Sequence, residues 1–297
     1  MQPVDIVPIP GPRAEAAAPP CLVVEVPHGA DRSADFHRLA GLLRGPLPAD
    51  LIDFFHVNTD VGAWALGVRV AERVVAARPT RAALALRCRV PRTFVDCNRV
   101  LDAKAAAEVT PGLHGYIRDP ADKALLIDLH RRYQRAVAQA ITRVCGAGGL
   151  ALLPHSYAPR SVDLTGTEDD LPALLRGAWA PGTAETWPLR ASVDLITETP
   201  EGLDQAIPGA AAALTAGFGA LGLDVAVNGT YTLHPATWAA AHAARWPGRT
   251  LCLELRRDLL VEAWTPFAEM QPDPTAIDRL AAPVAAFLDE ALRARGL

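Results

Sequence analysis

The stretch CLVVEVPHGADRS, residues 21–33, decides the fold class. Its first six residues form a short, mostly apolar run rich in β-branched side chains, and Pro27 ends that run. Such a pattern is typical of a strand buried on both faces, as in the parallel sheet of an α/β protein. His28 comes directly after the proline. Because α/β sheets bind ligands beyond the carboxyl ends of their strands, His28 is a candidate functional residue.

Similar runs alternate with helical patterns along the rest of the chain. Further strands are expected at 82–88, 93–96, 149–154, 192–197, 223–229 and 250–255. The run LIDFFHV (51–57) is also interpreted as a strand. Helical spacing predicts helices from about 61, over 122–145, 206–220 and 236–244, and from 275. The alternation predicts an α/β fold with a mixed, mostly parallel sheet flanked by helices on both faces.

The length of 297 residues suits one large domain. Residues 1–20 hold six prolines and no apolar period, which predicts an irregular lead-in before a single α/β domain at 21–297. The polar stretch 158–190 is interpreted as a long functional loop within that domain.

Composition excludes several classes of function. The formal net charge of −4 comes with no block of Lys and Arg, so no nucleic-acid partner is expected. Apolar stretches are broken well short of a membrane span, and the N-terminus lacks a secretion pattern, so we expect a soluble cytoplasmic protein with no membrane partner. The five cysteines form no CxxC pair and are expected to be buried free thiols.

Two histidines occupy equivalent places in distant strand-to-loop units. His28 and His155 each follow a proline at the end of an apolar run. Catalytic zinc needs three ligands from His and Asp or Glu and a position open to water, so these two could share a metal with an acid. Asp31 forms a His-x-x-Asp unit with His28, whereas Asp60 stands where the predicted strand 51–57 gives way to a helix. Otherwise Asp31 is a surface charge and Asp60 a helix N-cap.

Glu254 interrupts the apolar run TLCLEL at 250–255. Buried carboxylates are rare without a partner, and a carboxylate beside a metal is suited to general base and general acid catalysis. The alternative is an ion pair with Arg256 or Arg257.

The segment PRTFVDCNR, residues 91–99, is unusually polar for its place after an apolar run. Arg92 and Arg99 could clamp a substrate carboxylate, with Asn98 adding a hydrogen bond and Asp96 holding one arginine in place. The alternative is an internal network that ties the segment to its neighbours.

Together these stretches resemble the N-formylglutamate amidohydrolase family, which is related in fold to the zinc carboxypeptidases and the aspartoacylase group. The segment 91–99 is similar to the family's Ser-Arg-x-x-x-Asp-x-Asn-Arg signature and is the most specific match. The resemblance covers most of residues 21–262, and its other parts are VPHGADRS (26–33), NTDVG (58–62), LPHSY (153–157), VNGTY (227–231) and LCLELRRDLL (251–260).

The resemblance implies a zinc carboxypeptidase-like, or phosphorylase/hydrolase-like, fold and a zinc-dependent hydrolase of N-acyl amino acids. N-formyl-L-glutamate is the leading substrate, which implies a role in histidine degradation. The implied zinc ligands are His28, Asp60 and His155, with Asp31 as the alternative acid. Glu254 is implied as the catalytic carboxylate. The implied carboxylate clamp consists of Arg92, Asn98 and Arg99.

Two departures from the family leave alternatives open. Leu153 stands where the family often has an aspartate two residues before the second histidine, and residues 190–202 lack a Gly-rich run. A non-catalytic relative that binds an acylated amino acid or peptide terminus is therefore the alternative function. A metal-independent hydrolase using Ser156 is a weaker one, because no Gly-x-Ser-x-Gly elbow surrounds that serine. The sequence indicates neither the native metal nor the oligomeric state.

Overall fold

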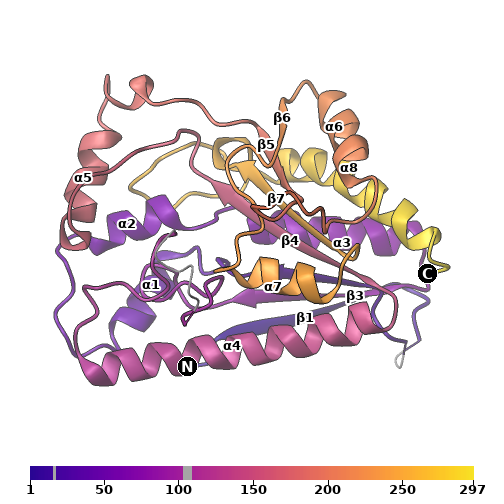
Figure 1. The fold of residues 1–297 in the computed structure, drawn as a ribbon, viewed down its shortest axis with the longest axis horizontal. Helices are drawn as coiled ribbons and strands as arrows, with labels where there is room; N and C mark the ends of the chain where they lie inside the picture. The colour runs from indigo at the N-terminus through magenta and orange to yellow at the C-terminus, as the bar shows by residue number, and fades with distance from the viewer. Residues whose placement is uncertain (16–17, 103–108) are drawn as a thin grey trace.

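The computed structural model describes residues 1–15, 18–102 and 109–297, and its centre is a seven-stranded mixed sheet in the order β1-β3-β2-β4-β7-β5-β6 (Figure 1). The strands are β1 (Val4–Pro10), β2 (Leu22–Val26), β3 (Ala82–Cys88), β4 (Leu150–Tyr157), β5 (Val193–Ile196), β6 (Val225–Val227) and β7 (Thr250–Arg256). The central strands β3, β2, β4 and β7 run parallel, whereas β1 and β5 pair antiparallel with their neighbours β3 and β7. The predicted mixed, mostly parallel sheet is confirmed.

Helices cover both faces of the sheet, as expected. Their bounds are α1 (Ser33–Ala40), α2 (Leu51–Asn58), α3 (Ala63–Ala77), α4 (Pro120–Gly146), α5 (Leu171–Ala178), α6 (Ala210–Gly219), α7 (Trp238–Arg245) and α8 (Pro274–Arg293). Apolar residues of α3, α6 and α8 pack on one face of the sheet, and those of α1, α2, α4 and α7 pack on the other. Among these described helices, none combines the length and apolar character needed to cross a lipid bilayer.

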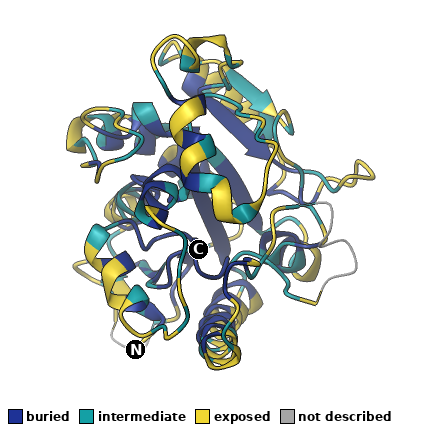
Figure 2. Ribbon diagram, turned by 90° about the vertical axis from the view of Figure 1, so that its left-hand side faces the viewer, coloured by how far each residue is buried: buried dark blue, intermediate teal, exposed yellow. Residues whose placement is uncertain are grey.

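Alternating side chains of each central strand fill the two halves of the core. In β2, Leu22 and Val24 belong to the cluster with α3 and α8, and Val23 belongs to the cluster with α4. The strands are therefore buried on both faces, and Figure 2 shows them enclosed by the helices. All five cysteines are buried and free, as predicted.

The path of the chain creates a crevice at the carboxyl end of the sheet. From β2 the chain first moves to β3 on one side and later returns to β4 on the other side of β2. The connections that leave the carboxyl ends of β2 and β4 therefore diverge, and such switch points are where open α/β sheets bind ligands.

The predicted irregular lead-in is wrong for residues 4–10, which form the edge strand β1. This strand pairs antiparallel with β3, from Val4 opposite Cys88 to Pro10 opposite Ala82. Proline cannot donate to a sheet ladder, but an edge strand tolerates it where its N–H would face solvent. The prolines that hid the strand in the sequence are thus compatible with its position at the edge.

Three other expectations are corrected. The run 51–57 was predicted as a strand but belongs to helix α2. The prediction failed because a short apolar run is compatible with either a buried helix or a buried strand. Residues 93–96 form turns with one isolated bridge, from Val95 to Leu113. The predicted loop 158–190 contains α5.

Candidate functional site

Two histidines and an aspartate meet in the crevice between β2 and β4. His28 lies just beyond the end of β2, and His155 lies near the carboxyl end of β4. Asp60 lies in the connection between α2 and α3. Nδ1 of His28 is 3.1 Å and Nδ1 of His155 is 2.9 Å from the same Asp60 oxygen, Oδ2. All three side chains are buried. The side chain of Asp60 is therefore not a helix N-cap but the centre of a His-Asp-His group.

This group suits a divalent metal ion. One potential ligand atom from each residue lies within 4.8 Å of the others. Two ligand atoms about 2.1 Å from a tetrahedral zinc ion lie roughly 3.4 Å apart, so a small outward movement of these three side chains would admit the ion. Two imidazole nitrogens and one carboxylate also form a donor set typical of catalytic zinc.

Asp31, the other candidate for the acidic ligand, lies outside this group. Its Oδ1 accepts a hydrogen bond of 2.7 Å from Nη2 of Arg87 and is 3.6 Å from Nε of Arg32. The carboxylate is thus held by arginines, and of the two candidate acids it is Asp60 that contacts both histidines.

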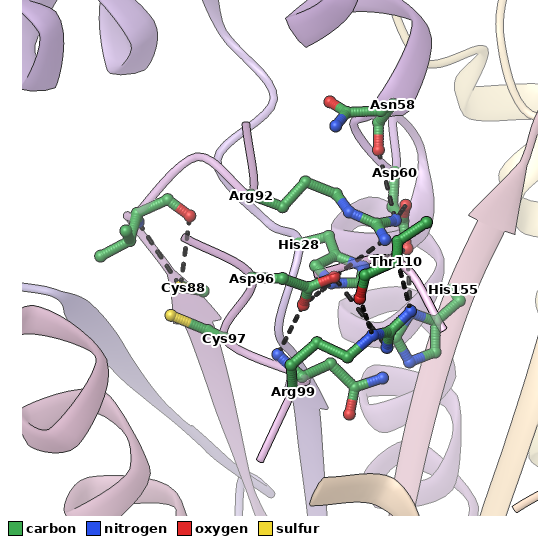
Figure 3. A network of polar contacts seen from close by, with 12 residues as sticks. His28, Asn58, Asp60, Cys88, Arg92, Asp96, Cys97, Arg99, Thr110 and His155 are labelled. Atoms are coloured by element: carbon green, nitrogen blue, oxygen red, sulfur yellow. Dashed lines mark hydrogen bonds and ion pairs between the residues drawn. The ribbon is translucent and has the colours of Figure 1, made fainter. Parts of the chain in front are cut away.

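Asp96 connects the His-Asp-His group to the segment 91–99 (Figure 3). Its Oδ1 is 2.8 Å from Nε2 of His28, and its Oδ2 accepts a hydrogen bond of 2.9 Å from Nη2 of Arg92. Because an ionised carboxylate can only accept, Nε2 of His28 donates this hydrogen bond, and a metal ion would bind the ring through Nδ1, which faces Asp60. The sequence predicted that Asp96 holds an arginine, but it did not indicate the contact with His28.

The electrostatics of the group keep both aspartates ionised. Burial alone would raise the pKa of the Asp60 carboxyl, but the neighbouring His28 and His155 hold that pKa well below its usual value. Burial likewise opposes ionisation of Asp96, and His28 and Arg92 hold its pKa well below normal. Conversely, burial disfavours the charged form of His155, yet its hydrogen bond to Asp60 raises its pKa to about 8. A metal ion bound here would therefore have to displace the proton that His155 holds at neutral pH.

Glu254 lies on β7, directly opposite His155 on β4. Its Oε2 is buried and has no hydrogen-bond partner among the described residues. Burial raises the pKa of this carboxyl to about 7, although the nearby His155 opposes the shift. A carboxyl with such a pKa can take up and release a proton near neutral pH.

The ion pairs considered as an alternative role for Glu254 are not formed within the described part of the chain. Arg256 bonds Asp258 at 2.9 Å. The buried Arg257 donates to the carbonyl oxygens of Val57, at 2.7 Å, and Ser156, at 3.0 Å. The sequence alone gave Arg257 no role beyond that ion pair.

Ser156 and Arg257 hold each other in place beside the site. The Ser156 hydroxyl donates to the carbonyl of Val61 at 2.9 Å and accepts from Nε of Arg257 at 3.3 Å. Burial lowers the pKa of Arg257 to about 10, which still leaves the guanidinium charged at neutral pH. Ser156 thus has a structural partner on each side and no adjacent base in its hydrogen bonds, which gives no support to a nucleophilic role.

Another buried carboxylate, Glu25, lies near the two histidines and was missed by the sequence reasoning. It interrupts the apolar run of β2, which is the same signal that drew attention to Glu254. The hydroxyl of Tyr133 on α4 donates to its Oε1 at 2.5 Å. Burial raises the pKa of Glu25, while the charges of His155 and His28 act in the opposite direction. Glu25 therefore adds a further acid to the environment of both histidines.

Two cavities adjoin the group and share Arg92, Thr110, Tyr231 and Glu254 in their walls. The smaller, of about 190 Å³, also contacts Asp60, Arg190 and Arg257. The larger, of about 460 Å³, is bounded by the two histidines and by apolar residues. The residues completing its wall include Asn98, Arg99, Ile196, Thr230, Thr232, Leu233, His234, Thr237, Ala239 and Cys252. A substrate centred on Glu254 could therefore extend to either side.

The predicted clamp residues line these cavities but also have partners of their own. Arg99 donates from Nε to the carbonyl of Thr110 at 3.2 Å and from Nη2 to its hydroxyl at 3.0 Å. The side-chain oxygen of Asn98 accepts from the backbone N–H of Ala239 at 3.1 Å, so its amide nitrogen is the group left to donate. Arg92, held by Asp96, reaches both cavities. The structure thus brings all three residues to one cavity wall.

Comparisons with known proteins identify similar sequences and folds. The family model for N-formylglutamate amidohydrolase matches residues 22–261. The crystal structure of N-formylglutamate amidohydrolase from Ralstonia eutropha JMP134 is similar, with a TM-score of 0.62 and 19% identity, over 99% of this chain and 100% of that one. A gene product of Agrobacterium tumefaciens has a TM-score of 0.55 and 17% identity, over 99% and 96% of the two chains. No curated protein matches the sequence. At these identities the two solved structures support the fold alone.

Proposed function

Because this chain belongs to the N-formylglutamate amidohydrolase family, we propose that it is a zinc-dependent enzyme that hydrolyses the amide of an N-acyl amino acid, with N-formyl-L-glutamate as the leading substrate. The observation that carries the proposal is the buried His-Asp-His group with Glu254 beside it. We also propose a cytoplasmic location and, for this substrate, a place in histidine degradation.

In this proposal His28, Asp60 and His155 hold the metal. Zinc at such a site supplies Lewis acidity, which lowers the pKa of water and polarises a carbonyl group. The hydrogen bond that Asp96 accepts from Nε2 of His28 fixes the ring so that Nδ1 faces the other two ligands. A partner of this kind typically strengthens metal binding about 10- to 100-fold.

Glu254 moves the protons. Its unpartnered Oε2 accepts a proton from the attacking water and then delivers it to the nitrogen of the leaving amino acid. The pKa of about 7 favours both steps near neutral pH. Arg257, which lines the same cavity as Glu254, stabilises the negative charge that develops on the acyl oxygen.

Arg92, Asn98 and Arg99 bind the carboxylate of the amino acid. Guanidinium groups offer two parallel N–H donors that match a carboxylate, and the free amide nitrogen of Asn98 adds a third donor. Asp96 and Thr110 hold the arginines in place before the substrate arrives, which reduces the entropy lost on binding.

The first test is elemental analysis of the purified protein together with an assay of N-formyl-L-glutamate hydrolysis before and after chelation. We expect about one zinc ion per chain, as a single three-ligand site requires, and loss of activity when it is removed. His155→Ala is expected to lose both. His242→Ala, which changes a buried histidine outside the group, serves as the matched control and should keep both.

A metal-free, inactive wild-type protein would refute the proposal. Bound zinc with intact substrate affinity but no turnover would instead favour the alternative, a relative that binds an acylated amino acid or peptide terminus without cleaving it.

Replacing Arg99 with alanine is expected mainly to raise KM, by about 10- to 100-fold, because a charge-assisted hydrogen bond contributes roughly 1.5–3 kcal/mol. The measurement is steady-state kinetics on N-formyl-L-glutamate and on its α-carboxamide, in which the α-carboxylate alone is replaced by an uncharged amide. The carboxamide lacks the charge that Arg99 would bind, so its KM should change far less. An equal loss on both substrates would mean that Arg99 only supports the segment through Thr110.

A further inference from the structure

A third cavity, of about 310 Å³, lies between α4 and the start of α7. It shares no lining residue with the two cavities of the candidate site, as far as the described residues show. Its wall is formed by Val100, Leu101, Asp102, Ile127, His130, Arg131, Gln134, Arg135 and Trp238. A cavity of this size is large enough for a small metabolite.

Three residues in this wall keep polar atoms without a partner among the described residues. His130 and Gln134 are only 3% and 7% exposed, yet His130 Nδ1 and Gln134 Oε1 accept no hydrogen bond, and Trp238 Nε1 donates none. Leaving a buried polar group unpaired costs about 1–3 kcal/mol, so such groups call for a partner.

The other atoms of these side chains show what kind of partner is missing. His130 donates from Nε2 to the carbonyl of Arg99 at 2.8 Å, and burial lowers its pKa, so the ring is neutral and Nδ1 is an acceptor. Gln134 donates from Nε2 to the carbonyl of Cys97, so its free Oε1 is also an acceptor. The cavity thus offers two buried acceptors and one donor, the indole N–H of Trp238.

Charged side chains surround these atoms. Arg131 and Arg135 are four residues apart on α4 and therefore project from the same side of the helix. Neither has an ion pair within the described part of the chain, and Asp102 is the acidic residue of the wall. Val100, Leu101 and Ile127 supply apolar surface.

We propose that this cavity binds a free α-amino acid with an apolar side chain. The carboxylate binds Arg131, Arg135 and the indole N–H of Trp238. The ammonium donates to Nδ1 of His130, Oε1 of Gln134 and the carboxylate of Asp102, and the side chain packs on the apolar wall. A simple anion would leave the two acceptors unpaired, and a simple amine would leave both arginines unpaired. A zwitterionic amino acid provides an ammonium for the two acceptors and a carboxylate for the two arginines.

The site is connected to the proposed substrate clamp through the backbone. His130 and Gln134 bond the carbonyls of Arg99 and Cys97, and the N–H of Trp238 donates to the carbonyl of Asn98 at 3.0 Å. An amino acid that orders these side chains therefore also orders the segment that carries Arg99. Binding does not depend on the proposed function, but the expected consequence, a changed KM for the N-acyl substrate, rests on it.

Calorimetric titration of the purified full-length protein with L-leucine tests the binding. Leucine should bind with a Kd below about 1 mM, and two analogues that lack one charge, 4-methylpentanoate and 3-methylbutylamine, should bind at least about tenfold more weakly. The double variant Arg131→Met/Arg135→Met should lose leucine binding. Arg143→Met, at an exposed position on the same helix, is the control that should retain it.

Three results would overturn the proposal: no heat of binding up to about 10 mM leucine, unchanged binding in the double variant, or equally tight binding of 4-methylpentanoate. Either of the first two results would mean that this cavity does not bind the amino acid. The third would mean that the cavity binds simple carboxylates and does not recognise the ammonium group. Gln134→Leu provides a second variant that should weaken leucine more than 4-methylpentanoate. Because calorimetry requires no turnover, a protein that binds leucine but hydrolyses no N-acyl amino acid would refute only the proposed function.

Discussion

Replacing Glu254 with glutamine is expected to lower kcat about 10²- to 10⁴-fold without removing the metal. Glutamine has nearly the same size and can occupy the same place on β7, but its amide cannot accept a proton. The wild-type carboxyl is suited to that role because its Oε2 is unpartnered and burial raises its pKa to about 7. Steady-state kinetics and elemental analysis of the same preparation separate the loss of proton transfer from a loss of metal.

Asp258→Asn is the matched control, because it also converts a carboxylate to an amide near the carboxyl end of β7. Asp258 pairs with Arg256 and lines neither cavity of the site. Its variant should retain turnover close to that of the wild type. Near-normal turnover of Glu254→Gln would remove Glu254 from the mechanism, and another acid, such as Glu25, would then have to carry the proton.

The parts of the fold that could be predicted are those in which local pattern and burial agree. Strands β2, β4 and β7 are buried on both faces, so each appears in the sequence as an almost continuous apolar run. Polar residues at their carboxyl ends then stand out, and this is how His28, His155 and Glu254 could be found. Their meeting follows from the parallel order of these strands.

The parts that could not be predicted depend on contacts between distant residues. Helix α2 and a buried strand have the same short apolar pattern, and only packing of α2 against α1 and α5 distinguishes them. The contact of Asp96 with His28 joins residues 68 positions apart, and nothing in the local sequence indicates it. Tyr133 reaches Glu25 across 108 positions, from a helix whose apolar stripe suggests only core packing. The site therefore contains more buried polar groups, and more hydrogen bonds between distant segments, than its sequence motifs indicate.

Replacing Asp60 with alanine is expected to empty the proposed metal site and abolish hydrolysis. Asp60 is the residue that both histidines contact, at 3.1 and 2.9 Å, and without it the site loses its acidic ligand and keeps two imidazoles. The loss of metal affinity should exceed the roughly 10- to 100-fold that follows removal of a partner that merely orients a ligand. Zinc titration of the metal-free variant beside the wild type measures this difference directly.

Asp31→Ala is the control that makes the result decisive, because Asp31 is equally buried and only three residues from His28. Its carboxylate is occupied by Arg87 at 2.7 Å, so its removal should leave metal content unchanged and at most affect stability. The reverse outcome, a full site in Asp60→Ala and an empty one in Asp31→Ala, would give the ligand role to Asp31. The chain would then have to release Asp31 from Arg87 on binding metal, and Asp60 would serve to orient the two histidines.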